Sequence, residues 1–174
     1  MLVTYPDDKL YEKSISAIDN LTIDERKDLS VEMRKACGEV NGFGISAIQI
    51  GQPYQILGFV SPEKKDLVWM CDPVIEWMSE IHTSFSEGCL SIPGYFWEIS
   101  RPDYIKVSFK DINGNPNQKT FSGSDSRIIQ HEMDHLDGLL IVDFLEEQDF
   151  ILFYNHYKKQ SHIEEYISPT LTII

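Results

Sequence analysis

The chain has 174 residues and a formal net charge of −13, and 42% of its residues are hydrophobic. This length and composition predict a globular chain with a sizeable core and exclude a disordered one. The acidic balance, with a pI of about 4.7, argues against nucleic-acid binding and against docking on anionic lipid, because both need a basic surface.

No membrane or export segment is visible in the sequence. No apolar run approaches the ~18 residues of a membrane span, and residues 1–8 lack the basic and apolar regions of a signal peptide. The cysteines, Cys37, Cys71 and Cys89, are odd in number, which fits a reducing compartment. We therefore expect a cytoplasmic protein, with an organelle as the alternative.

The first predicted element is a helix that begins after Thr22. Thr22 and Glu25 have the spacing of a capping box, in which each side chain bonds the other residue's backbone N–H. Apolar residues follow at helical spacing as far as Gly42. This stripe is Leu29, Met33, Ala36, Cys37 and Val40. Cys37 is therefore predicted to be a core residue, and so is Cys71, which ends an apolar run.

Several short β-strands are predicted between this helix and residue 123. They cover residues 54–60, 67–70, about 81–85, 104–110 and 117–122. Apolar and polar residues alternate in 105–109, as they do in a half-buried strand. Asn113 and Gly114 are a strong turn signal, so the last two strands are predicted to form an antiparallel hairpin.

Two further helices are predicted in the C-terminal part. Gly123 opens the first, and Gly138 follows its last turn. Asp143 and Glu146 resemble a capping box and predict the second helix over roughly 145–159. The predicted class is α+β, with mostly antiparallel sheets packed around a central metal-binding helix and with helices near both ends.

The central helix carries the string His131-Glu132-Met133-Asp134-His135, an H-E-x-x-H motif. On a helix, residues i and i+4 share a face, so both imidazoles are able to bind one metal ion. Glu132 lies about 100° round the helix from His131 and is placed to transfer protons beside the metal. The alternative, a pair of surface histidines, is less favoured, because the chain has only five histidines.

Two histidines leave a catalytic zinc-type centre without its third protein ligand. Cys89 is the better candidate, because it is a soft thiolate donor beside a glycine, although on its own it reads as a small buried hydrophobe. The metzincin pattern places Ile141 at the ligand position, and isoleucine binds no metal. The downstream acids, which lack a recognisable context, are Glu146, Glu147, Glu164 and Glu165. By ligand type alone, two histidines and a cysteine suit zinc.

Three strings together resemble the signature motifs of peptide deformylases, and they occur in the right order. They are GFGISAIQ at residues 42–49, EGCLS at 87–91 and QHEMDHL at 130–136. The similarity runs from residue 4 to about residue 144. It implies a metal-dependent amidohydrolase that removes the N-formyl group from the initiator methionine of nascent polypeptides and releases formate. The implied partners are therefore N-formylmethionyl peptides.

The resemblance also implies the parts of the site. The implied metal ligands are Cys89, His131 and His135. The implied catalytic groups are Glu132 as general acid/base, with the Gln49 amide and the Leu90 backbone N–H as oxyanion donors. The implied cofactor is one divalent metal ion, Fe(II) in vivo, with Zn, Ni or Co able to occupy the site.

In this family the peptide substrate adds as a strand between the first two motifs. The substrate contacts that this implies are Phe43, Gly44, Gly88 and Ile128. For Phe43 and Ile128, ordinary core packing is an equal alternative. Glu87 and Arg101 match an ion pair that supports the second motif, and the alternative is a surface pair of little energetic weight.

The chain departs from the family pattern at a few positions and in its tail. Ile45 and Ser46 stand where the first motif usually carries Leu and Ala, and Asp72 replaces a usual Asn before proline. We predict one catalytic domain over residues 1–174, with a divergent tail from about residue 146. In the tail, five acidic residues outnumber two lysines. Bacterial members can dock on the ribosome through a basic C-terminal helix, so weak or no docking is expected here.

Two other functions compete with this one. A general H-E-x-x-H metallopeptidase is disfavoured by the missing downstream ligand and by the absence of a secretion signal. An inactive homologue acting as a binding module is disfavoured because the implied ligands, the acid/base residue and Gln49 are all intact.

Overall fold

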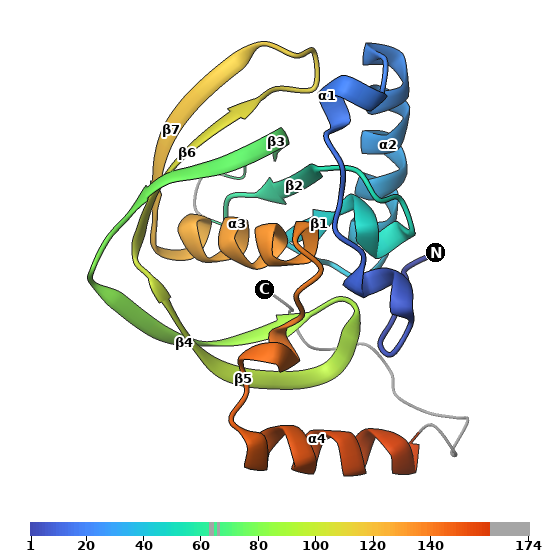
Figure 1. Cartoon of the computed structure of the whole chain (residues 1–174), viewed down its shortest axis with the longest axis vertical. Helices are drawn as coiled ribbons and strands as arrows, with labels where there is room; N and C mark the ends of the chain where they lie inside the picture. Colours follow the sequence, from blue (N-terminus) through green and yellow to red (C-terminus); the bar gives the residue numbers. More distant parts are fainter. Residues whose placement is uncertain (63–64, 66, 161–174) are drawn as a thin grey trace.

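Helix α3 (Gly123–Leu136) lies in the middle of the fold, and the two sheets and the other helices surround it (Figure 1). This computed structural model describes residues 1–62, 65 and 67–160. The predicted α+β class is confirmed, and every pairing within the two sheets is antiparallel. None of the helices in the described part of the chain has the length and apolar character of a membrane-spanning segment.

The larger sheet has five strands in the order β1-β2-β3-β6-β7. They are β1 (Gly44–Ser46), β2 (Ile56–Val60), β3 (Leu67–Met78), β6 (Tyr104–Lys110) and β7 (Pro116–Ser122). The smaller sheet is a hairpin of β4 (His82–Cys89) and β5 (Ile92–Pro102). Strand β1 pairs only with β2, and β4 only with β5, so within the described residues each has one edge without a strand partner.

The first long helix, α2, begins where the capping box predicts it. The Thr22 Oγ1 accepts a hydrogen bond from the Glu25 N–H at 3.3 Å, and the Glu25 carboxylate accepts one from the Thr22 N–H at 2.8 Å. The helix ends at Glu39, three residues before the predicted Gly42. The helical elements besides α3 are η1 (Asp8–Tyr11), α1 (Ala17–Asn20), α2 (Ile23–Glu39), η2 (Ala47–Ile50), η3 (Ile141–Phe144) and α4 (Glu147–Gln160).

The strand predictions are confirmed in part. Strands β6 and β7 form the predicted hairpin, and Gly114 in its turn has a φ of +92°. The strand predicted at about 81–85 is longer and runs to Cys89. Its partner β5 was not predicted, because Pro93 and Gly94 near its start hide any regular alternation. Strand β5 forms because it pairs with β4, and this pairing cannot be read from the sequence of β5 alone.

The predicted end of the strand at 67–70 was wrong, because β3 continues through Asp72 and Pro73 to Met78. Asp72 has a φ of 49° and lies at a shift of register between β3 and β6. Its carboxylate accepts hydrogen bonds from the Ser16 hydroxyl at 2.8 Å and from the Ala17 N–H at 2.7 Å. The Asp-Pro pair is therefore a bulge within a strand, and it caps the start of α1.

The helix predicted over roughly 145–159 is confirmed as α4, but its predicted capping box was wrong. The Asp143 carboxylate accepts a hydrogen bond from the Leu140 N–H at 2.7 Å and so belongs to η3. Helix α4 begins at Glu147 instead. Residues 161–174, which complete the predicted tail, lie outside the described residues.

Apolar packing fixes α3 against the larger sheet. Ile128, Ile129 and Leu136 are buried in one cluster with residues of β2, β3, β6 and β7. A second cluster lies under α2 and includes the buried Cys71, with Cys37 packed partly buried against it. All three cysteines are free. The carrier of the H-E-x-x-H motif is therefore held by the core of the protein.

Candidate metal centre and active site

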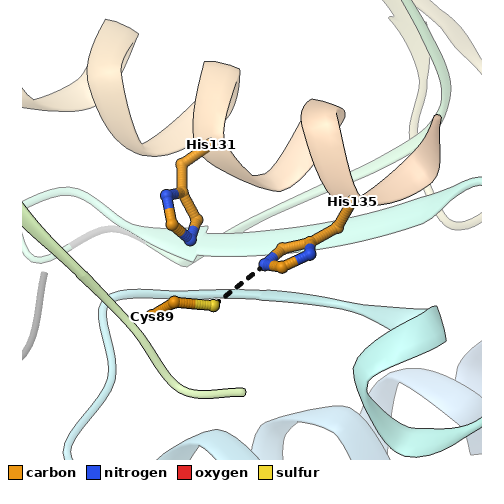
Figure 2. Close-up of side chains that lie close together, drawn as sticks. All are labelled: Cys89, His131 and His135. Atoms are coloured by element: carbon orange, nitrogen blue, oxygen red, sulfur yellow. Dashed lines mark hydrogen bonds between the residues drawn. The ribbon is translucent and has the colours of Figure 1, made fainter. Parts of the chain in front are cut away.

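Three candidate metal ligands converge between α3 and the end of β4. One donor atom from each of Cys89, His131 and His135 lies within 4.8 Å of the others, and all three side chains are buried. Figure 2 shows both imidazoles projecting from one face of α3 towards the cysteine. The Cys89 Sγ lies 3.2 Å from the His135 Nε2. A thiolate and two imidazoles in this arrangement form a donor set for a transition-metal ion.

Local irregularities bring these two elements together. Gly123 has a φ of +57°, which glycine adopts without steric cost, and the chain turns there from β7 into α3. In the β4–β5 hairpin, the register shifts between Gly88 and Cys89. Such a shift re-aims a side chain, and here Cys89 faces the helix.

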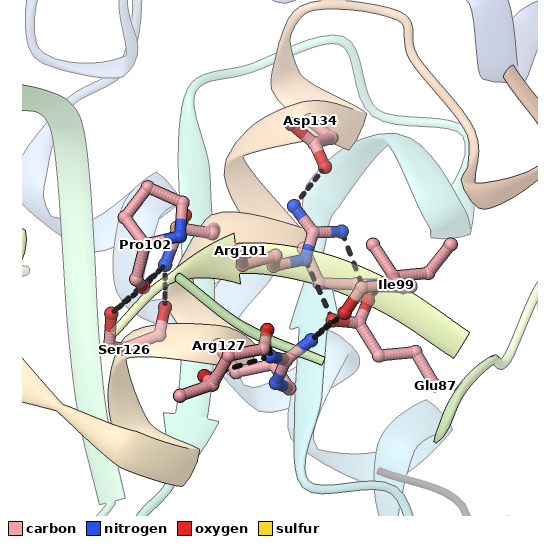
Figure 3. Close-up of polar contacts among 10 residues, drawn as sticks. Glu87, Ile99, Arg101, Pro102, Ser126, Arg127 and Asp134 are labelled. Carbon is pink, nitrogen blue, oxygen red and sulfur yellow. Dashed lines mark hydrogen bonds and ion pairs between the residues drawn. The ribbon is translucent and has the colours of Figure 1, made fainter. Parts of the chain in front are cut away.

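Glu87 orients the first histidine from inside the protein. Its carboxylate lies 3.2 Å from the His131 Nδ1. It also accepts two hydrogen bonds from Arg101, at 2.7 and 3.0 Å (Figure 3). A carboxylate only accepts, so the imidazole donates through Nδ1 and keeps the lone pair of Nε2 for a metal. Burial alone raises the pKa of Glu87, but the hydrogen bonds from His131 and Arg101 outweigh it and hold that pKa at about 2.

The ion pair of Glu87 and Arg101 is buried, with side-chain exposures of 1% and 6%, so the alternative of a surface pair does not apply. Arg101 also donates to the Asp134 carboxylate at 2.8 Å. Its guanidinium thereby joins β5, β4 and α3 around the candidate ligands.

Arg127 is a second buried guanidinium on the same carboxylate, and the sequence reasoning did not identify it. It donates to Glu87 Oε1, to the Ile99 carbonyl at 2.8 Å and to the Thr83 carbonyl. A signal was present, because Arg127 precedes His131 by four residues and so shares its helix face. Figure 3 shows it reaching from α3 into the β4–β5 hairpin.

Glu132 lies beside the cluster and is 4% exposed. Its Oε2 accepts a hydrogen bond from the Ser46 hydroxyl at 2.6 Å. A Cβ at Gly44 would lie only 2.5 Å from the Glu132 Oε1, so this approach of β1 to α3 requires a glycine. Burial raises the pKa of Glu132 to about 6, against the opposing effects of the charge on His131 and the Ser46 hydrogen bond. A carboxyl group with this pKa is suited to exchanging protons near neutral pH.

Gln49 and Leu90 flank the cysteine. The Gln49 Oε1 accepts a hydrogen bond from the Ser46 N–H at 2.9 Å, which leaves its Nε2 3.8 Å from the Cys89 Sγ and 3.2 Å from the Ser91 Oγ. The amide is therefore oriented with its NH₂ group towards the cluster. Leu90 follows the cysteine directly and is buried.

A narrow pocket, without room for a water molecule, lies beside the first histidine. It is lined by Glu87, Gly88, Arg127, Ile128, His131 and Glu132. Of the predicted substrate contacts, Gly88 and Ile128 line this pocket and Gly44 borders it at Glu132. Phe43 lies apart from the lining, partly buried against the core cluster of α3, and its carbonyl accepts a hydrogen bond from the Val60 N–H at 2.7 Å.

The sequence model of the family described as Polypeptide deformylase matches residues 1–150 of the chain. The chain belongs to this family. A peptide deformylase of Pelagibacter ubique is 35% identical over 149 residues, which are 84% of this chain and 86% of that protein.

Solved structures agree with this assignment. A crystal structure of peptide deformylase from Ehrlichia chaffeensis has a TM-score of 0.85 at 30% identity, covering 95% of this chain and 98% of that chain. A probable peptide deformylase from synechococcus phage S-SSM7 has a TM-score of 0.78 at 33% identity, covering 83% of this chain and 99% of that chain.

Membership in the peptide deformylase family makes this chain a hydrolase that removes the N-formyl group from nascent polypeptides. The general metallopeptidase and the inactive binding module are not favoured. The family and the cluster of Cys89, His131 and His135 together support a site for a single metal ion.

Proposed function

We propose that deformylation takes place at the buried centre between α3 and β4. The proposed ligands are Cys89, His131 and His135, and the proposed catalytic groups are Glu132, Gln49 and the Leu90 backbone N–H. The observation that carries the proposal is the convergence of the three donor atoms within 4.8 Å, beside a buried carboxyl group whose pKa is raised to about 6.

The charges around the centre favour a divalent cation. Four negative groups surround it if the cysteine is a thiolate, against two guanidinium groups, which leaves two negative charges to balance. The negative groups are Glu87, Glu132, Asp134 and the Cys89 thiolate, and the positive ones are Arg101 and Arg127. From the resemblance to the family we infer Fe(II) as the ion in vivo. The soft thiolate and the two imidazoles would also accept Zn, Ni or Co.

When bound, such an ion acidifies a water molecule and polarises a carbonyl group. Glu132 takes the proton of the attacking water and passes it to the nitrogen of the departing amine. The Gln49 Nε2 and the Leu90 N–H donate to the oxyanion that forms on the formyl group. Loss of one such donor typically lowers kcat by ~10²–10³-fold. Formate leaves, and the peptide keeps a free amino terminus.

The peptide substrate is proposed to add as a strand at the open edges of β1 and β4. Both strands lack a second partner within the described residues. Strand β1 lies next to α3, and β4 contacts α3 through Glu87. Main-chain bonds at such edges bind an extended peptide without regard to its sequence. The methionine side chain would then lie against Gly88 and Ile128, which must move apart to admit it, with Gly44 and Phe43 on the other side of the peptide.

The place of action is proposed to be the cytoplasm, where nascent chains emerge. We expect weak or no ribosome docking through residues 146–174, because five acidic residues outnumber two lysines in this segment. Cosedimentation of the chain with ribosomes in low and high salt tests this. A salt-sensitive association that disappears when residues 146–174 are deleted would contradict it.

The decisive experiment is anaerobic purification with metal analysis, followed by formate release from formyl-Met-Ala-Ser. We expect one metal ion per chain and a loss of kcat by ~10²–10⁴-fold in Glu132→Gln, with metal retained. The matched control is Glu146→Gln, an exposed acid outside the centre. Full activity of Glu132→Gln, or equal cleavage of unformylated Met-Ala-Ser, would reject the proposed function.

A further inference from the structure

Ser46 joins the two proposed catalytic side chains from the end of β1. It is fully buried, and its Oγ lies 2.6 Å from the Glu132 Oε2 and 3.0 Å from the Glu132 backbone carbonyl oxygen. A hydroxyl group has one proton to donate. The shorter contact, to a charged acceptor, makes the stronger bond. The Ser46 hydroxyl group therefore donates its hydrogen bond to the Glu132 carboxylate.

The other carboxylate oxygen has a different environment. The Glu132 Oε1 faces Gly44, where an added Cβ would lie 2.5 Å away, and no described residue donates a hydrogen bond to it. The carboxylate is therefore held between a hydrogen bond on one side and a glycine backbone on the other. Glu132 also lines the pocket beside His131, so an untethered oxygen is available on the side where substrate is proposed to bind.

We propose that Ser46 is a positioning residue that tethers the Oε2 of Glu132 and thereby assigns proton transfer to the Oε1. This inference rests on the proposed function of Glu132 as the general acid/base. A carboxylate fixed in one rotation presents its free oxygen to the reacting water in every encounter, whereas a rotating one does so for part of the time.

The hydroxyl group acts separately from the rest of the residue. The Ser46 backbone N–H donates to the Gln49 Oε1, and this bond survives any change of the side chain. Replacement by alanine therefore removes the tether on Glu132 and keeps the orientation of the Gln49 amide. Alanine is also the residue that the first motif usually carries, so the tether is a feature of this chain and adds to the common reaction.

The test compares metal-loaded Ser46→Ala and Ser46→Cys with the wild type on formyl-Met-Ala-Ser. Cysteine fills the space of serine but is a weak donor. We expect both variants to lose about three- to tenfold in kcat, with KM within twofold of wild type. Metal content and the visible spectrum of the Co(II)-loaded protein, which reports on Cys89, should stay unchanged.

The control is Ser126→Ala, which removes another fully buried hydroxyl group on α3, one that contacts the Pro102 carbonyl. We expect its kcat to stay within twofold of wild type. A wild-type kcat in Ser46→Ala would overturn the proposed tether. Full activity of Ser46→Cys together with a reduced kcat of Ser46→Ala would also overturn it, because the Ser46 side chain would then act by filling space. Glu132→Gln separates the two claims, because its inactivity supports the general base whatever Ser46 does.

Discussion

Replacing Arg127 with leucine tests whether the buried guanidinium pair holds the metal-binding elements together. The change removes a charged hydrogen bond to Glu87 and the donors to the carbonyl groups of Ile99 and Thr83. Removing one partner of a buried ion pair typically costs ~3–5 kcal/mol. Here Glu87 keeps its two bonds from Arg101 and its contact with His131, so the cost should lie at the lower end.

The magnitude follows from these contacts. One hydrogen bond to a charged group contributes ~1.5–3 kcal/mol, and each hydrogen bond lost by a carbonyl group adds ~0.5–1.5 kcal/mol. The packing of leucine returns part of this. We expect Arg127→Leu to lower the free energy of unfolding by about 3 kcal/mol. Because Glu87 orients His131, metal affinity should also fall about tenfold.

Urea unfolding in the presence of a chelator measures the first effect, and competition with a chelating dye measures the second. The matched control is Lys13→Leu, which breaks an ion pair of 3.0 Å with Asp137 whose side chains are 73% and 57% exposed. Such surface pairs contribute at most ~1 kcal/mol. If Arg127→Leu costs no more than Lys13→Leu, the reasoning about the buried network is wrong.

Three further predictions follow from the structure. The fold lowers the pKa of Glu87 from 4.5 to about 2, so its ionised carboxylate stabilises the folded state. This stabilisation is complete above pH 4.5 and is lost as the pH falls towards 2. The stabilisation is about 3 kcal/mol. With a chelator present, the free energy of unfolding of Glu87→Gln should therefore depend less on pH in that range than that of the wild type, and equal dependence would contradict the prediction. Gly44→Ala should lose more than tenfold in kcat with metal retained, because its Cβ would meet the proposed general base, whereas Gly38→Ala, with nothing within 4 Å, should match wild type. Burial raises the pKa of Cys37 and Cys71 to about 12, so in the metal-loaded protein neither should react with iodoacetamide at pH 8 until it is unfolded, as peptide mass mapping can show.

Much of the centre could be predicted because its chemistry is tied to residue type and spacing. The two histidines share a helix face by the helical period alone. Cys89 was the better candidate for the third ligand because it is a soft donor beside a glycine, and its sulfur lies near both ring nitrogens. The capping box of Thr22 was readable for the same reason, since both of its partners lie within one turn.

The missed features depend on partners far away in the chain. Asp72 reads as a turn residue, but its bonds to Ser16 and Ala17 make it a bulge within a strand. Arg127 reads as a surface cation until Glu87, 40 residues away, is placed against it. Ser46 reads as a small substitution, and its role depends on a carboxylate 86 residues further on. Local patterns carry no information about such contacts.

The Glu87 carboxylate is bound by two guanidinium groups, those of Arg101 and Arg127. Through Arg101 and Arg127, ion pairs with Glu87 and Asp134 join the strand that carries Cys89 to the helix that carries both histidines. With these bonds in place, we expect exchange of one divalent ion for another at the proposed centre to leave β4 and α3 joined.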